Sequence, residues 1–272
     1  MRVYYESGMA NGSVSLDMNP YYLTDETDLF DYSWKYSDDR NKIRVISKSY
    51  GERKLPILIK ARTKQECENA RNELCSIFEN DVINNKRGRL YVSDYYIECF
   101  VISSKKDMHT IRNNHALIEY TVVTKGDWTR EQTIDFLQES HSHGGFDYEY
   151  DYEYDFGLEN AGESSLTNEH YYDVNFIITV SGQCTNPSIT IGDNTYTVNV
   201  ELNLGDNLFI NSKEKTIYVI RANGYYENRF ASRDRSNYIF EPIKSGYNKV
   251  SWNGEYRWQI TLIEERSEPK WT

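Results

Sequence analysis

The chain has 272 residues and carries 31 basic and 42 acidic side chains, which gives a formal net charge of −11. A chain with this net negative charge repels nucleic-acid phosphates and anionic lipid, so the composition argues against a DNA-binding or membrane-surface protein. A domain takes roughly 150 residues, and the length therefore fits two domains.

The N-terminal stretch MRVYYESGMANGS lacks the apolar core of a signal peptide, and no later apolar run approaches the roughly 20 residues of a membrane span. We therefore expect synthesis and use in the cytoplasm, without a membrane partner. Four cysteines show no C-x-x-C spacing and no histidine partners in sequence, which predicts buried thiols and neither a zinc site nor disulfides. They are Cys67, Cys75, Cys99 and Cys184.

The first half of the chain has a mixed α and β pattern. Short alternating segments cover residues 32–36 and 43–49, and Gly51 then marks a turn before the apolar run LPILIK at 55–60, which is compatible with a hairpin. Three further segments have strand-like composition. They lie at residues 89–92, 95–103 and 116–124.

A helix is predicted over residues 63–85. Thr63 and Glu66 form the T-x-x-E pattern of a capping box, and Arg87 and Gly88 are expected to end the helix. We expect its apolar side chains, above all Leu74, Ile77 and Phe78, to pack against a sheet of the first domain. The apolar stripe at helical spacing consists of Cys67, Ala70, Leu74, Ile77, Phe78 and Val82.

A change of pattern after residue 128 predicts a domain boundary. Residues 128–140 lose their period, HSHGG follows at 141–145, and FDYEYDYEYDFG at 146–157 alternates aromatic and acidic side chains. In an extended chain the rings would share one face and the carboxylates the other. We therefore assign residues 1–140 to the first domain and 141–168 to a linker. The tyrosines Tyr148, Tyr150, Tyr152 and Tyr154 are its candidate interface residues.

The remaining residues, 169–272, have an almost purely β pattern. Short strands are separated by Gly, Asn, Asp and Pro, with no helical pattern between them, which predicts a β-sandwich. Asn253 and Gly254 form a strong hairpin signal between the last two predicted strands, at 249–252 and 255–264. The predicted fold class is mainly β, with one helix in the first domain.

No pattern of residues points to a reaction. The chain has no G-x-S-x-G, no phosphate-binding loop and no H-E-x-x-H, so we predict no enzyme and no catalytic or cofactor-binding residues. His141 and His143, with Asp147 and Glu149 nearby, could bind a metal ion, but a polar loop is the favoured interpretation because no third ligand has a fixed position. A glycosidase would need a distinguished pair of carboxylates, and no motif marks one.

One segment of the second domain resembles the sugar site of galectins. Trp252, Glu255 and Arg257 in WNGEYR have similar spacing to a tryptophan that stacks on galactose and a charged pair that binds its hydroxyls. The chain departs from that pattern at Asn253, where galectins have glycine, and it lacks their H-x-N-x-R segment. These three residues are candidate sugar contacts, and a plain hairpin turn is the alternative.

Five longer stretches, taken together, have a recognisable pattern: MANGSVSLDMNPYYLTDETDLFDYSWKYSDD, FDYEYDYEYDFG, SGQCTNPSITIGDNTY, IFEPIKSGYNKVSWNG and LIEERSEPKW. They resemble the distal tail (Dit) proteins of siphophages that infect Gram-positive bacteria. The likeness runs in order along essentially the whole chain.

The resemblance implies a structural virion protein at the distal tail tip, made in the host cytoplasm. In that family an N-terminal domain with one helix forms a six-membered ring around the tail channel, and a galectin-like sandwich lies outside. The implied partners are five further copies, the tail tube protein, a tail-associated lysin or fibre, and receptor-binding or baseplate proteins, while DNA only passes through. The competing interpretation is a carbohydrate-binding sandwich for attachment to the host surface.

Overall fold

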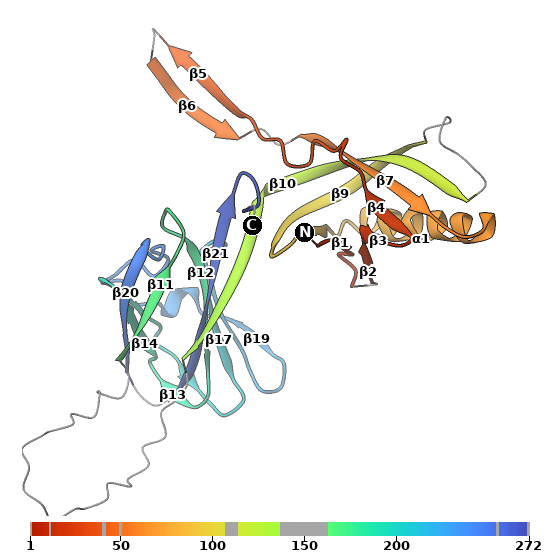
Figure 1. Cartoon of the computed structure of the whole chain (residues 1–272). Helices are drawn as coiled ribbons and strands as arrows, with labels where there is room; N and C mark the ends of the chain where they lie inside the picture. The colour runs from red at the N-terminus through yellow and green to blue at the C-terminus, as the bar shows by residue number, and fades with distance from the viewer. Residues whose placement is uncertain are drawn as a thin grey trace, which may run out of the picture. The chain divides into compact units, whose positions relative to one another are not determined.

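The computed structural model describes residues 2–10, 12–39, 42–48, 51–106, 114–136, 163–253 and 256–270. The chain forms two compact units (Figure 1). Unit 1 comprises Met1–Arg130 and Glu265–Thr272, and unit 2 comprises Glu131–Glu264. The sequence placed the boundary after residue 140 and began the second domain at 169, whereas the structure divides the chain within one long strand and includes residues 163–168 in the sandwich as a strand.

Unit 1 combines an antiparallel sheet with one helix. The strand order is β2-β1-β8-β9-β10-β7-β4-β3. Its elements are β1 (Val3–Glu6), β2 (Ser13–Ser15), β3 (Asp17–Met18), β4 (Tyr21–Leu23), β5 (Trp34–Asp39), β6 (Lys42–Lys48), β7 (Glu52–Lys60), α1 (Lys64–Ile83), β8 (Gly88–Val92), β9 (Tyr95–Lys106) and most of β10 (His115–Phe136). One apolar core joins the helix to the sheet.

The hairpin expected from the run at 55–60 is wrong. Strand β7 pairs with β10 and β4, while the hairpin forms earlier, between β5 and β6. Leu55, Ile57 and Ile59 lie on one face of β7 and are completely inaccessible to solvent, which places this strand in the apolar core of unit 1. The strands that pair with β7 come from other segments of the chain, which a local pattern does not reveal.

Helix α1 confirms the predicted helix. The Thr63 side chain accepts a hydrogen bond from the Glu66 backbone at 3.2 Å, and the Glu66 carboxylate accepts one from the Arg62 backbone at 2.9 Å. Leu74 and Phe78 are buried as expected, with the Phe78 ring edge-on to Tyr5 at 5.0 Å. Val82 is 42 % exposed, and a polar residue, Asp81, is buried in the last turn instead.

The end of the helix differs from the prediction. The helix stops at Ile83, and Asn85 adopts a left-handed conformation with φ 51°. Gly88 already belongs to β8, where a Cβ atom would lie 1.9 Å from the Tyr5 hydroxyl oxygen. Glycine at this position therefore makes room for a buried tyrosine ring, and the left-handed Asn85 provides the turn that was assigned to Gly88.

Strand β10 explains the loss of period after residue 128. The strand continues to Phe136, but its pairing with β9 shifts register between Lys125 and Thr129, and Gly126 there has φ 87°. Such a bulge changes which residues face the core, so a real strand loses its simple alternation in the sequence. Trp128, inside this irregular segment, is completely buried.

Unit 2 is a β-sandwich, as predicted. One sheet has the order β19-β18-β17-β12-β21 and continues to β10, and the other has the order β11-β20-β14-β15. A second apolar core contains residues of both sheets. The further elements are β11 (Glu163–Asn168), β12 (Asn175–Ser181), β13 (Cys184–Thr185), β14 (Ser188–Ile191), β15 (Asn194–Thr197), β16 (Glu201–Leu202), β17 (Asn207–Asn211), β18 (Thr216–Ile220), β19 (Tyr226–Asn228), the 3-10 turn η1 (Phe230–Ser232), β20 (Gly246–Trp252) and β21 (Arg257–Arg266).

The hairpin predicted at Asn253 is wrong, because β20 and β21 belong to opposite sheets. The Asn253 backbone donates to the Ser188 carbonyl at 3.0 Å, and its side chain accepts hydrogen bonds from the Ser188 backbone at 2.7 Å and the Tyr256 hydroxyl at 2.8 Å. Asn253 therefore fastens the connection to the start of β14. The chain crosses from one sheet to the other here and does not turn back on itself.

Candidate functional site

Histidine and cysteine side chains are the groups that the sequence analysis considered as metal ligands. No group of three or more His, Cys, Asp or Glu among these residues could hold a metal ion, and His141 and His143 lie outside the described part of the chain. Cys67 and Cys99 are buried free thiols as predicted, but Cys75 is exposed and Cys184 is only half-buried, which corrects two of the four predictions. Burial raises the pKa of the Cys99 thiol to about 12, so it stays protonated.

Within the described part of the chain, no helix has the length and apolar character that a membrane span needs. Three regions of the surface are candidates for contact with a partner: the hairpin formed by β5 and β6, the outer face of the sandwich, and the residues predicted to contact sugar.

The β5–β6 hairpin, called the arm below, carries exposed aromatic rings. Its two strands pair only with each other among the described strands, so they form a separate two-stranded sheet (Figure 1). Trp34 is 51 % exposed and Tyr36 is 69 % exposed, and their spacing places both on one face of β5. A two-stranded ribbon is only marginally stable by itself, and exposed rings on it are typical of a surface that contacts a partner.

Three aromatic rings line up across neighbouring strands on the outer face of the sandwich. Phe209 of β17 stacks on Tyr218 of β18 with 4.9 Å between ring centroids, and Tyr218 stacks on Tyr226 of β19 at the same distance. These side chains alternate with Leu208, Val219 and their neighbours, which point into the core. The stacked rings cover each other's faces, so they offer mainly their edges to a partner.

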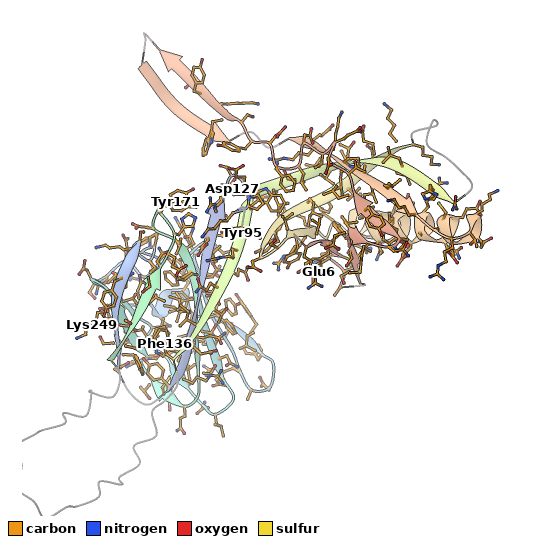
Figure 2. All side chains as sticks on the ribbon, viewed as in Figure 1. Glu6, Tyr95, Asp127, Phe136, Tyr171 and Lys249 are labelled. Carbon is orange, nitrogen blue, oxygen red and sulfur yellow. The ribbon has the colours of Figure 1, made fainter. Side chains whose placement is uncertain are left out.

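Two of the three residues predicted to contact sugar, Trp252 and Arg257, are among the described residues, and both make contacts within unit 2. The Trp252 ring is half-buried and packs edge-on against Phe136, which Figure 2 labels, at 5.9 Å and against Trp258 at 5.8 Å, beside the sandwich core. The exposed Arg257 forms an ion pair with Asp135 at 3.1 Å. Glu255 lies outside the described residues, as do Tyr148, Tyr150, Tyr152 and Tyr154. Both sets therefore remain predictions.

A buried carboxylate in unit 1 was missed by the sequence reasoning. Asp81 is inaccessible to solvent and accepts hydrogen bonds from the Tyr5 hydroxyl at 2.8 Å, the Ser7 hydroxyl at 2.7 Å and the backbone of Gly8 and Met9 at 3.2 and 3.3 Å. The sequence could have indicated this burial, because Asp81 lies seven residues after Leu74 and therefore on the same face of the helix as the apolar stripe. The arrangement fastens the N-terminal strand and its turn to the helix, which is a structural role.

Comparison with known proteins gives matches only among solved structures, since no family model and no curated protein sequence matches the chain. A chain of the phage P2 baseplate in its activated conformation with calcium has a TM-score of 0.63 and 11 % identity, covering 99 % of this chain and 100 % of that one. The same baseplate with strontium gives a TM-score of 0.62 at 11 % identity, with the same coverage.

The Dit protein of SPP1, described as a paradigm of the hub of the adsorption apparatus in phages of Gram-positive bacteria, has a TM-score of 0.58 and 10 % identity, covering 97 % of this chain and 98 % of that one. The resemblance predicted from sequence is thus confirmed at the level of the fold. At 10 to 11 % identity the likeness concerns the fold and not the side chains of a site.

Proposed function

We propose that the chain is a structural hub subunit at the distal end of a phage tail. The observation that carries the proposal is the extent of the structural likeness: both units are matched in one alignment that spans nearly the full length of the SPP1 Dit protein and of a P2 baseplate chain. A likeness confined to one sandwich would be uninformative, because sandwiches serve many unrelated functions.

The hub is a ring of six copies in which unit 1 surrounds the channel. Cyclic closure with six copies requires two different patches on each subunit, one for each neighbour. The exposed rings of the arm supply one such patch, because burying Trp34 and Tyr36 against a neighbouring copy removes apolar surface from water.

The other parts of the chain fit this assignment. The net charge of −11 allows DNA to pass a channel without being held, since phosphates are repelled by acidic side chains. The tyrosines of residues 146–157, a stretch that belongs to unit 2 and does not connect the units, pack on that unit or on a neighbouring copy. The ring links the tail tube protein to a tail-associated lysin or fibre, and unit 2 carries receptor-binding or baseplate proteins.

The mass of the purified full chain in solution tests the ring. Light scattering after size exclusion, with negative-stain images of the same peak, should give six copies of 32.1 kDa, or two stacked rings, around a central hole. The double variant Trp34→Ser, Tyr36→Ser should lower this mass while its circular dichroism stays unchanged. Replacing Arg235, an exposed residue of unit 2, with Gln provides the control.

Two results would count against the proposal. A strict monomer at high concentration, with no ring formed when tail tube protein is added, contradicts the hub. A ring that persists in the arm variant refutes the contact assigned to Trp34 and Tyr36 but leaves the hub itself standing. The variant with serine at Tyr148, Tyr150, Tyr152 and Tyr154 then shows whether these four tyrosines stabilise the ring.

A further inference from the structure

An open cleft of about 700 Å³ lies in unit 2, between the segment that contains β16 and leads into β17 and the residues that follow β18. This volume falls within the roughly 300 to 1,000 Å³ that small-molecule sites occupy. Its walls come from two loops that are distant in sequence, together with one residue after β19. The lining residues are Asn199, Val200, Glu201, Asn203, Leu204, Asp206, Arg221, Ala222, Asn223 and Arg229.

Two arginines in this cleft are held in fixed positions. Arg221 donates to the Asp206 carboxylate at 2.8 Å, to the Glu201 carbonyl at 3.0 Å and twice to the Glu227 carboxylate, at 2.9 and 2.6 Å. Arg229 donates to the other oxygen of Glu227 at 2.5 Å. Hydrogen bonds from Arg229 and Arg221 hold the pKa of Glu227 below its usual range, so the network remains charged near neutral pH.

Polar groups remain available in the cleft after this network is formed. Arg229 is partly exposed, and among the described residues its side chain donates a hydrogen bond through one nitrogen only, to Glu227. The side-chain amides of Asn199 and Asn203 make no hydrogen bond in the described part of the chain, and Asn223 uses only its oxygen, to accept from the Tyr225 backbone. The cleft thus offers several donors and acceptors on a rigid frame, which is what a specific polar ligand needs.

The lining arginines, Arg221 and Arg229, are opposed by Glu201 and Asp206, and Glu227 behind the lining pairs with both arginines. No positive charge is therefore left unpaired to hold an anionic ligand. Such a wall suits a neutral molecule with many hydroxyl groups, each of which donates to a carboxylate or amide oxygen and accepts from a guanidinium or amide. Leu204, which is 83 % exposed, supplies an apolar contact for the C–H face of a sugar ring.

We propose that this cleft binds a neutral saccharide, with Arg229, Asn199 and Asn203 as its principal contacts. A peptide segment fits less well, because the walls provide no enclosed apolar pocket for a side chain. The site differs from the one suggested by Trp252, Glu255 and Arg257, and it does not depend on the ring, since every lining residue belongs to one copy of unit 2.

The test uses the full-length chain on an array of neutral di- to tetrasaccharides built from glucose, galactose, rhamnose and N-acetylglucosamine, followed by calorimetric titration of the best binder. Arg229→Gln and, separately, Asn199→Ala with Asn203→Ala should each weaken binding about tenfold or more. The asparagine variant disturbs no hydrogen bond of the described chain, so it remains informative if Arg229→Gln folds poorly. Arg235→Gln and Trp252→Ala are the controls and should bind like wild type.

Each other outcome overturns the proposal. Absence of binding to every neutral saccharide refutes the ligand class, and binding confined to anionic glycans does the same. Binding that survives both cleft variants but is lost in Trp252→Ala moves the site to the position that the sequence suggested. Ring formation is measured separately by mass, so a failure here says nothing against the hub.

Discussion

The two units use charged side chains in opposite ways. In unit 1 the carboxylate of Asp81 is fully buried and accepts hydrogen bonds from residues 5–9, which fasten the N-terminal segment to the helix. In unit 2 the carboxylate of Asp206 is also buried, but its partner Arg221 is partly exposed and lines an open cleft. A buried charge that is fully committed stabilises a fold, whereas a fixed charge beside open space can also recognise a ligand.

The largest effect is expected in the apolar core of unit 1. Phe78→Ala removes a buried ring that packs edge-on against Tyr5 at 5.0 Å and Tyr120 at 5.1 Å, so the free energy of unfolding should fall by about 3 to 5 kcal/mol. Urea unfolding of the two proteins measures the difference. Val82→Ala, on the same helix but largely exposed, should cost less than about 1 kcal/mol. Equal losses from both variants would place Phe78 outside the core.

The second largest effect is expected for the buried carboxylate of Asp81. Asp81→Ala leaves the hydroxyls of Tyr5 and Ser7 without their acceptor, and each buried donor left unpaired costs about 1 to 3 kcal/mol, so we expect a loss of about 3 kcal/mol. Hydrogen exchange should rise in β1 and α1. Glu79→Ala, which removes an exposed carboxylate from the same helix, is the matched control. A neutral Asp81→Ala variant would mean that the N-terminal segment is held by apolar packing alone.

The cleft network of unit 2 should make stability depend on acid pH. Hydrogen bonds from the Asn203 backbone and the Arg221 side chain hold the pKa of Asp206 below its usual range. The contribution of Asp206 is therefore complete above the unfolded-state pKa of about 3.9 and is lost as the pH falls through the lower folded-state value.

Asp206→Asn removes this charge and should cost about 1.5 to 3 kcal/mol at pH 6, the usual worth of a hydrogen bond to a charged group. The gap between wild type and variant should shrink as the pH falls from about 5 to 2. Urea unfolding at several pH values, followed by hydrogen exchange of β17 and β18, measures it. A gap that stays constant with pH would show that Asp206 does not stabilise unit 2 through its charge.

Local patterns in the sequence account for much of the fold. Helix α1 and the β-sandwich of short strands were predicted because the periodicity, caps and turn residues that indicate them lie within single segments. Interactions between distant segments were not predictable. The bulge at Gly126 hid the second half of β10, and the bonds from Asn253 to Ser188 turned an expected hairpin into a crossing between sheets.

The candidate cleft was beyond sequence reasoning for the same reason. Its walls combine residues 199–206 with residues 221–229, and none of these residues forms a recognisable motif. The sequence instead pointed to Trp252 and Arg257, which are close in the chain but engaged elsewhere: the indole packs beside the core, and the guanidinium is paired with Asp135.

The smallest effect is expected for the exposed ion pair between Arg257 and Asp135, which is the surface counterpart of the two buried carboxylates. Arg257 and Asp135 are both about half exposed, with 3.1 Å between the paired atoms, so water and salt screen their attraction. Arg257→Gln should change the free energy of unfolding by about 0 to 1 kcal/mol, and a double-mutant cycle with Asp135→Asn should give a coupling of similar size. A coupling above about 2 kcal/mol would mean that this pair is shielded from solvent in the assembled protein, and charge at the surface of unit 2 would then be structural as it is in unit 1.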